Sequence, residues 1–322
     1  MKNILIVGGA GYIGSCTVKH FLDHGYNCIV MDNLIYGHRK AVDKRAKFIH
    51  ADLLDLYSLK QVFINEKIDA IVHFAAFAYV GESVINPQKY YQNNIIGTLN
   101  LLNVMLEHNI KNIVFSSTCA TYGEPQYTPI DEHHPQSPIN AYGRTKLMVE
   151  QIFKDYEIAY GLKHISLRYF NAAGAMDDIG ESHDPETHLI PLVLKAIKGE
   201  MEHINIFGND YDTNDGTCIR DYIHIEDLAS AHRLALENLD KYNGCINLGT
   251  GIGTSVKEII KAAEEVSGKK CPIIHAPRRA GDPAKLYADN KKAKEILGWD
   301  IKYKDIKDII KSAWNWEINR RF

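Results

Sequence analysis

The stretch Gly8-Gly9-Ala10-Gly11-Tyr12-Ile13-Gly14 decides the fold, because it directly follows the apolar run at residues 4–7. Its glycines satisfy both Gly-x-Gly-x-x-Gly, counted from Gly9, and Gly-x-x-Gly-x-x-Gly, counted from Gly8. A helical pattern then begins at Ser15 and continues to Gly25. In this context the glycines let the backbone approach a pyrophosphate, and the helix N-terminus supplies N–H groups and a positive dipole end. The stretch predicts a dinucleotide-binding turn.

Further short apolar runs alternate with helical patterns along the first half of the chain. The predicted strands are residues 27–31, 47–49, 70–73, 112–115 and 164–168, and the predicted helices include residues 90–106 and 142–160. This alternation predicts an α/β fold in which helices cover both faces of a Rossmann-type, doubly wound parallel sheet.

Beyond Asn171 the regular alternation ends. Residues 172–188, 205–215 and 278–283 have the composition of loops, between predicted elements at 226–237, 245–248 and 256–266. We expect an NAD-binding domain at residues 1–170, with a returning segment near 218–248. A smaller C-terminal α/β substrate lobe at residues 171–322 is interleaved with it.

The composition excludes several classes of protein. The chain has 322 residues, 45% hydrophobic and 24% charged, with a net charge of -3, so no basic nucleic-acid-binding surface is expected. The apolar runs are far shorter than the ~20 residues of a membrane span, and the first run is too short for a signal peptide. Six dispersed cysteines indicate reduced thiols and a cytoplasmic protein. We found no paired ligand spacing among the 15 histidines and expect no metal site; His133-His134 reads as surface loop.

Acidic residues at two predicted strand ends bear on the cofactor. Asp32 ends the second strand, where a carboxylate binds the adenosine ribose hydroxyls and repels a 2′-phosphate, so NAD is favoured over NADP. Arg39 follows closely and leaves NADP open. Asp52-Leu53 follows the third strand as a candidate adenine contact, although Asp52 is equally suited to capping a turn.

The fourth and fifth predicted strands end in residues suited to a ligand crevice. Phe74-Ala75-Ala76 would let a cofactor lie close to the strand end, and Asn93 would reach it from the next helix. Thr118 ends the following segment, at the sheet edge where doubly wound folds bind ligands, and is a candidate to hydrogen-bond a substrate oxygen.

Tyr142 and Lys146 are four residues apart and therefore share one face of a helix. A free tyrosine has a pKa of about 10. A neighbouring ammonium, and further a bound nicotinamide cation, would favour the phenolate and make Tyr142 a base for a hydroxyl proton. The same spacing also occurs on solvent-exposed helix faces, so the surroundings decide. Arg220 and Arg279 lie in predicted loops and are of the residue type suited to phosphate.

Together these residues resemble the UDP-glucose (UDP-galactose) 4-epimerases of the extended short-chain dehydrogenase/reductase family, over essentially the whole length. The motifs that carry the resemblance are Gly-Gly-Ala-Gly-Tyr-Ile-Gly-Ser (8–15), Asp32-Asn33-Leu34, His73-Phe74-Ala75-Ala76, Val80-Gly81-Glu82-Ser83, Phe115-Ser116-Ser117-Thr118, Tyr142-Gly-x-x-Lys146, Leu147-Met148-Val149-Glu150, Leu167-Arg168-Tyr169-Phe170-Asn171, Phe207-Gly208-Asn209-Asp210-Tyr211, Asp215-Gly216-Thr217, Arg220-Asp221-Tyr222-Ile223-His224 and Arg278-Arg279-x-Gly281-Asp282.

The resemblance implies a bound NAD that is regenerated in each turnover. Tyr142 would take the proton of the sugar 4-hydroxyl while C4 gives its hydride to the nicotinamide. Thr118 would hydrogen-bond the 4-oxygen, and Lys146 would bind the nicotinamide ribose and lower the pKa of Tyr142. The 4-keto sugar would turn about its diphosphate and receive the hydride on its other face.

The resemblance also implies the binding residues. Those expected at NAD are Gly8, Gly11, Tyr12, Ile13, Gly14, Asp32, Asn33, Asp52, Leu53, Phe74, Ala75, Ala76, Asn93, Tyr142, Lys146, Tyr169 and Phe170. Those expected at the UDP-sugar are Thr118, Asn171, Leu189, Asn205, Phe207, Arg220, Arg279, Asp282 and Leu286. A homodimer formed through the helices at 90–106 and 142–160 is expected by the same resemblance.

Three positions depart from the family pattern. Ala78 stands where many members carry lysine, so one cofactor contact is missing. Thr187-His188 replaces paired asparagines before the uridine-site Leu-x-Pro. Leu286 replaces the tyrosine of glucose-restricted members, which leaves more room beside the sugar 2-position. UDP-N-acetylhexosamines would then be interconverted too, unless neighbouring side chains fill the space.

Three alternative functions differ in the residues that they require. A nucleotide-sugar dehydratase or decarboxylase is disfavoured, because dehydratases carry Asp-Glu directly after the threonine and this chain has Cys119-Ala120, which offer no carboxylates for elimination. A UDP-pentose or UDP-uronate 4-epimerase stays open, since the same Thr-Tyr-Lys chemistry would serve it. A non-catalytic NAD-binding regulator would have no need of Tyr142 and Lys146.

Overall fold

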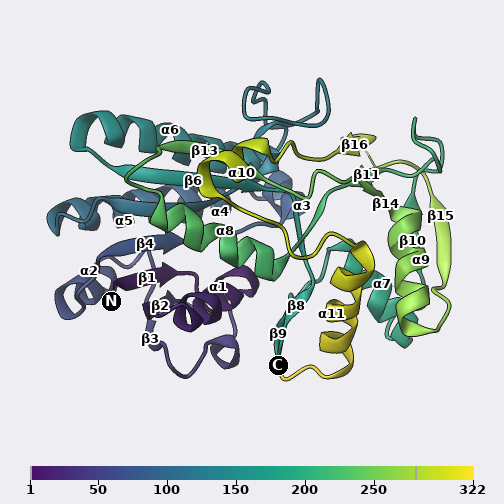
Figure 1. The fold of residues 1–322 in the computed structure, drawn as a ribbon, viewed down its shortest axis with the longest axis horizontal. Helices are drawn as coiled ribbons and strands as arrows, with labels where there is room; N and C mark the ends of the chain where they lie inside the picture. The colour runs from purple at the N-terminus through teal and green to yellow at the C-terminus, as the bar shows by residue number, and fades with distance from the viewer. Residues whose placement is uncertain (1, 280) are drawn as a thin grey trace.

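Seven parallel strands form the main sheet of the computed structural model, which describes residues 2–279 and 281–322 (Figure 1). The strand order is β13-β6-β5-β4-β1-β2-β3. The bounds are β1 (Asn3–Val7), β2 (Asn27–Asp32), β3 (Lys47–His50), β4 (Ala70–His73), β5 (Asn112–Thr118), β6 (Lys163–Tyr169) and β13 (Gly244–Leu248). The order reverses at β1, so the carboxyl ends of β1 and β4 border the crevice where such sheets bind ligands. The predicted α/β class is confirmed.

Helices pack on both faces of this sheet because its strands are apolar on both sides. Ile4 and Ile6 of β1 belong to a core shared with α1 (Tyr12–Asp23) and α8 (Ile225–Glu237). Leu5 and Val7 point the other way, as successive strand residues must, and share a second core with three other helices. Those helices are α2 (Leu56–Asn65), α5 (Gly97–Glu107) and α6 (Ala141–Tyr160).

A third core gathers the helices of the second half of the chain, on the right of Figure 1. The helices are α7 (Leu189–Lys198), α9 (Val256–Ser267) and α11 (Ile306–Ile318), while α10 (Lys291–Leu297) packs on the main sheet. The short strands are β7 (Asn171–Ala173), β8 (Ala175–Met176), β9 (Ile179–Gly180), β10 (Ile204–Phe207), β11 (Ile219–Arg220), β12 (Tyr222–His224), β14 (Thr254–Ser255), β15 (Ile273–Ala276) and β16 (Lys285–Leu286). Between them, α8 and β13 return the chain to the main sheet.

The structure corrects three local predictions. Helix α1 begins at Tyr12, three residues before the predicted start. The predicted helix at 90–106 is divided into α4 (Pro87–Tyr90), a π-helical stretch (Tyr91–Ile96) and α5, after the short helix α3 (Val80–Ile85). The segment 205–215 was predicted to be loop throughout, but it begins inside β10, whose Ile204 and Ile206 are buried.

No helix within residues 2–279 and 281–322 has the length and apolar character needed to cross a membrane.

A buried ion pair ties α6 to the edge of the main sheet. Arg168 of β6 donates two hydrogen bonds, 2.9 and 2.6 Å long, to the two carboxylate oxygens of Glu150 in α6. Ser117 of β5 donates to the same carboxylate at 2.5 Å. Arg168 also donates to the Tyr122 hydroxyl, which in turn donates to Asn247 of β13. The network therefore connects three strands with the helix that carries Tyr142.

Glu150→Gln should lower the free energy of unfolding by about 3–5 kcal/mol, because it leaves the buried Arg168 charge without its anion. Urea denaturation measures the change. Asp155→Asn on the exposed side of the same helix is the matched control and should stay within about 0.5 kcal/mol of wild type. A Glu150→Gln loss no larger than that of the control would contradict this role of the ion pair.

Candidate active site

The glycine turn brings the ends of β1 and β4 into close contact. Gly8 adopts a φ of +81°, and a Cβ placed on it would lie 2.5 Å from the backbone nitrogen of Ala75. The Val7 carbonyl accepts hydrogen bonds from the backbone N–H groups of Phe74 and Ala75 at 2.7 and 3.0 Å. Only glycine combines this backbone conformation with this approach. The predicted cofactor residues 8–14 and 74–76 are therefore neighbours.

Helix α1 begins at this turn without a side-chain cap. Its N-cap residue is Gly11, which offers no side-chain acceptor, and its first turn carries no acidic residue. Other helices are capped by side chains, for example α6 by Asn140 and α9 by Ser255. The first N–H groups of α1, beside Tyr12, Ile13 and Gly14, thus suit an external anion. This is the feature of the structure that fits the diphosphate of NAD.

Asp32 lies at the end of β2, next to the glycine turn. Its carboxylate accepts hydrogen bonds from the backbone N–H groups of Ala10 at 2.9 Å and Leu34 at 2.8 Å. Burial raises the pKa of Asp32. The carboxylate is thus fixed in orientation beside the turn, as binding of ribose hydroxyls requires.

A cavity of about 300 Å³ is lined by Asp52, a predicted adenine contact, and by Asn93, which was predicted to reach the cofactor. Asn33 donates to the Asp52 carboxylate at 2.8 Å, which orients this wall. Leu53, also predicted here, is buried in the core beneath α5 instead of lining the cavity. The lining residues that sequence reasoning missed are Ile35, Leu54, Phe77, Asn86, Gln88, Lys89 and Gln92.

Lys89 supplies a cation at the border of this cavity, whereas the exposed Ala78 does not reach it. The Lys89 ammonium lies 4.4 Å from the centre of the Phe77 ring and 2.7 Å from a Glu82 carboxylate oxygen. This chain lacks a lysine at position 78, but Lys89 supplies a positive charge close to that position.

The π-helical stretch places a second asparagine in the site. Asn94 is buried, accepts from the Phe77 backbone N–H at 2.9 Å and donates to the Phe77 carbonyl at 3.1 Å. It also donates to the Thr145 hydroxyl of α6. The sequence pattern singled out Asn93 and missed Asn94, because a regular helix was expected. π turns are frequent at functional sites.

Thr118 and Tyr142 meet where α6 approaches the end of β5. The close approach requires Gly143, because a Cβ there would lie 2.4 Å from the Ala120 carbonyl oxygen. Lys146, one turn along α6, is buried and donates a 2.7 Å hydrogen bond to the Ser116 carbonyl. The three predicted catalytic residues therefore lie together at the carboxyl end of β5.

Burial dominates the protonation of this group. It raises the pKa of Tyr142 to about 12, which a hydrogen bond with the Thr118 side chain partly counteracts. Burial also lowers the pKa of Lys146 to about 7, against the attraction of Glu150. The sequence predicted a lowered tyrosine pKa. That prediction was wrong for the protein alone, because burial of the phenol raises its pKa and burial also lowers the pKa of Lys146, whose charge would favour the phenolate.

The end of β6 completes the floor of the site. The Tyr169 hydroxyl hydrogen-bonds the Ser116 hydroxyl, and Tyr142 is among the groups that raise the pKa of Tyr169, after burial. Phe170 and Leu286 belong to a small apolar cluster that includes Cys119. Leu286 therefore packs against the same cluster as Cys119, the residue after Thr118, although it is remote in sequence.

The predicted diphosphate-side residues are grouped around β11 and β16. Arg220 pairs in register with Leu286, and its guanidinium lies 2.5 Å from an Asp282 carboxylate oxygen. Burial raises the pKa of the Cys119 thiol, and the positive charge of Arg220 partly lowers it. Arg220 therefore lies near the residue that follows Thr118. The Arg279 guanidinium lies 4.5 Å from the centre of the Phe207 ring.

The remaining substrate-side residues are more dispersed. Asn171 in β7 donates its side-chain N–H to the Asp221 carbonyl at 3.1 Å. Leu189 begins α7 and packs on the third core, while Asn205 is exposed on β10.

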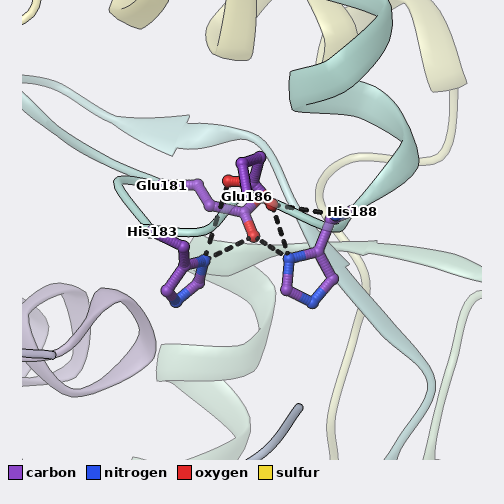
Figure 2. Close-up of side chains that lie close together, drawn as sticks. All are labelled: Glu181, His183, Glu186 and His188. Carbon is purple, nitrogen blue, oxygen red and sulfur yellow. Dashed lines mark hydrogen bonds and ion pairs between the residues drawn. The ribbon is translucent and has the colours of Figure 1, made fainter. Parts of the chain in front are cut away.

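The segment before α7 holds a cluster that sequence reasoning missed. Glu181, His183, Glu186 and His188 each place a ligand-type atom within 4.8 Å of the others (Figure 2). Burial lowers the pKa of His188, but Glu181 and Glu186 outweigh it and raise the value to about 10. The signal was present as Glu-x-His-x-x-Glu-x-His in a segment expected to be loop.

Comparisons with known proteins agree with this geometry. Residues 4–249 match the NAD dependent epimerase/dehydratase family. A UDP-glucose 4-epimerase from Lacticaseibacillus casei is 53% identical over 320 residues, covering 98% of this chain and 97% of the relative. The crystal structure of UDP-glucose 4-epimerase from Brucella ovis in complex with NAD is 49% identical with a TM-score of 0.95, and the match covers 98% of each chain. The UDP-Glc/GlcNAc 4-epimerase from Campylobacter jejuni is 45% identical with a TM-score of 0.89, covering 99% and 100% of the two chains.

Proposed function

The chain belongs to the NAD dependent epimerase/dehydratase family, and from that premise we propose that it inverts C4 of UDP-hexoses, interconverting UDP-galactose and UDP-glucose. The observation that carries the proposal is the meeting of Thr118, Tyr142 and Lys146 at the end of β5. It occurs in a chain that is 53% identical, over nearly its full length, to a UDP-glucose 4-epimerase.

NAD, when bound at the turn of residues 8–14, would supply a hydride acceptor for C4 and the hydride donor for its return. The protein supplies the acid–base chemistry. Tyr142 takes the proton of the 4-hydroxyl at its phenolic oxygen and returns it to the 4-oxygen at the end of turnover. Thr118 hydrogen-bonds the same oxygen. Lys146, fixed by the Ser116 carbonyl, is positioned to favour the phenolate when it carries its proton.

Inversion also requires the 4-keto sugar to present its second face while its nucleotide stays bound. Arg220 and Arg279 are proposed to hold the diphosphate. The ion pair with Asp282 fixes the fork of the Arg220 guanidinium, and Phe207 supports the plane of Arg279. The sugar itself faces the apolar cluster around Leu286, which offers no hydrogen bonds that would hold one face.

Elimination is not supported by the groups beside Thr118. Cys119 follows it, and burial raises the pKa of that thiol to about 12, so the thiol is neutral. Ala120 has no ionisable group. A proton donor and acceptor for the loss of the 6-hydroxyl are therefore missing at these two positions.

Purified protein given UDP-galactose, with no added NAD, should form UDP-glucose. Tyr142→Phe should reduce kcat by at least about 100-fold, because general acid–base catalysis contributes typically 10²–10⁴-fold. Chromatographic separation of UDP-galactose and UDP-glucose in samples quenched at intervals measures the rate without any added NAD. Tyr160→Phe, at the exposed end of the same helix, is the matched control and should keep the wild-type rate.

One outcome would overturn this function, and a second would overturn only the role of Tyr142. A wild-type protein that carries NAD but does not convert UDP-galactose would exclude the epimerase. A Tyr142→Phe variant as active as Tyr160→Phe would remove Tyr142 from the chemistry while leaving the substrate class intact.

We further propose that the sugar pocket accepts UDP-N-acetylhexosamines. The support is that Leu286 packs against the apolar cluster that includes Cys119 and Phe170, where a leucine takes less room than a tyrosine. The Campylobacter jejuni relative is a UDP-Glc/GlcNAc 4-epimerase.

Leu286→Tyr should lower turnover of UDP-N-acetylgalactosamine by about 10-fold or more and change that of UDP-galactose little, because the added ring occupies the space of the acetyl group. Parallel assays with both substrates and a UDP-pentose measure this. Leu286→Met keeps the volume and is the control. No turnover of the acetylated sugar by wild type would exclude the wide pocket.

A homodimer and a cytoplasmic location stay proposals. Exposed apolar side chains on the helices expected at the interface support the dimer, including Ile96, Met148 and Ile158. Six free cysteines suit a reducing compartment. Analytical ultracentrifugation tests the dimer, and sedimentation as a monomer at micromolar concentration would exclude it.

A further inference from the structure

Four side chains between β9 and α7 converge on one point, and none of them takes part in the C4 chemistry proposed above (Figure 2). His188 Nδ1 lies 2.7 Å from Glu181 Oε1 and 3.0 Å from Glu186 Oε1. His183 Nδ1 lies 3.1 Å from Glu181 Oε1 and 3.8 Å from Glu186 Oε2. The Nδ1 atoms of two imidazoles therefore lie close to oxygens of two carboxylates, at distances that would let one ion contact all four side chains.

One oxygen in this cluster is left without a hydrogen bond. Glu186 Oε2 is buried and has no hydrogen-bond partner among the described residues, and the Glu186 side chain is only 2% exposed. Its other oxygen accepts from the backbone N–H groups of Thr187 and His188 at 2.7 and 2.8 Å, which fixes the carboxylate. A buried anionic oxygen without a partner is costly, and a cation at the centre of the cluster would satisfy it.

We propose that Glu181, His183, Glu186 and His188 bind one divalent transition-metal ion of the zinc class, through both Nδ1 atoms and one oxygen of each carboxylate. Imidazole and carboxylate are ligands that zinc accepts in tetrahedral sites. With metal–ligand bonds of about 2.0–2.1 Å, the edges of such a tetrahedron are about 3.3 Å. Among both Nδ1 atoms, Glu181 Oε1 and the free Glu186 Oε2, the three nitrogen–oxygen contacts of the structure are 2.7, 3.1 and 3.8 Å, on both sides of that value.

An ion with four protein ligands would have a structural role and not a catalytic one. Four protein ligands close a tetrahedral site and leave no position for a substrate. Two carboxylates balance the charge of a divalent ion while both imidazoles stay neutral. His188 is half-exposed, so an ion can enter from solvent, whereas both carboxylates are buried.

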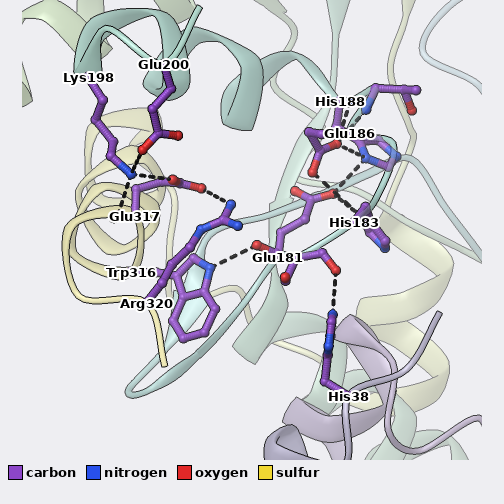
Figure 3. A network of polar contacts seen from close by, with 12 residues as sticks. His38, Glu181, His183, Glu186, His188, Lys198, Glu200, Trp316, Glu317 and Arg320 are labelled. Carbon is purple, nitrogen blue, oxygen red and sulfur yellow. Dashed lines mark hydrogen bonds and ion pairs between the residues drawn. The ribbon is translucent and has the colours of Figure 1, made fainter. Parts of the chain in front are cut away.

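The ion would fix a segment that connects distant parts of the molecule (Figure 3). The Glu181 carbonyl accepts from Trp316 Nε1 of α11 at 2.9 Å, and the Ser182 carbonyl contacts His38 Nε2 at 3.0 Å. The His183 ring packs edge-on against Tyr12, the first residue of α1, with ring centres 6.3 Å apart. His188 directly precedes Leu189, the first residue of α7. The metal would therefore hold the starts of α1 and α7 in place.

The competing occupant of the cluster is a proton on His188, which would bridge the two carboxylates without any metal. A bound proton and a bound metal ion would require different residues of the cluster. A proton needs only the His188 contacts, whereas a metal also needs His183 and the free oxygen of Glu186. Variants at those two positions therefore separate the alternatives.

The test uses full-length protein stripped with a chelator, dialysed against zinc chloride and analysed by plasma mass spectrometry. Wild type should retain about one zinc per chain, and cobalt(II) in its place should show the intense visible absorption of a tetrahedral site. Glu186→Gln and His183→Gln should each weaken zinc binding by more than about 100-fold, because even changes around the ligands of a metal cost 10–100-fold. His133→Gln, at an exposed histidine outside the cluster, is the control and should bind like wild type.

Thermal unfolding supplies a readout that does not depend on activity or on the folding of one variant. Zinc should raise the Tm of wild type and of His133→Gln, and should leave the Tm of both cluster variants unchanged, since only a ligand bound to the native state stabilises it. Zinc retention by wild type that equals retention by His183→Gln, at either none or one ion per chain, would overturn the proposal. The epimerase assay does not enter this result, so the two proposals fail independently.

Discussion

The close approach of β1 and β4 at their carboxyl ends is the constraint on which the site depends. Because Gly8 has no side chain, the backbone of residues 74–76 lies directly against the turn, and α1 starts at the centre of the sheet edge. The N–H groups at the start of α1, the Asp32 carboxylate and the end of β5 then border one crevice. A side chain at Gly8 would separate the two strands and disperse this arrangement.

The proposed chemistry at Tyr142 and Lys146 would take place in surroundings that disfavour charged groups. Burial raises the pKa of Tyr142 and lowers that of Lys146, so both groups are driven toward their neutral forms. Such a pair is ready to carry a proton once a charged ligand changes the balance, which is the usual use of perturbed pKa values in active sites. The buried ion pair between Glu150 and Arg168 holds α6, the helix that carries both groups, against the sheet and so stabilises their burial.

Much of the fold was predictable, because hydrophobic periodicity and glycine spacing are local signals. The strands of the main sheet were placed to within a few residues, and the position of Asp32 followed from them. The π-helical stretch was not predictable, because its inward-facing Asn94 is explained only by contacts with Phe77 and Thr145. Strand β10 was missed because Asn205 separates its two buried isoleucines and the loop-like residues Gly208-Asn209-Asp210 follow it directly.

The site was predicted unevenly for related reasons. The individual roles of the cofactor and substrate residues, and the division into domains at residue 170, stay predictions. The direction of the Tyr142 pKa was wrong because burial cannot be read from a four-residue spacing. The cluster of Glu181, His183, Glu186 and His188 was not predicted, because the four residues are spread along a segment without regular structure. Only the folded chain brings their side chains together.

The central claim is that C4 is oxidised and reduced by the same hydride while Tyr142 handles only the proton. The most direct measurement follows deuterium placed at C4 of UDP-galactose through conversion in ordinary water. The account predicts that UDP-glucose keeps the deuterium at C4, because the hydride never exchanges with solvent. Loss of the deuterium to water would contradict it, and would show that C4 is inverted by proton removal instead.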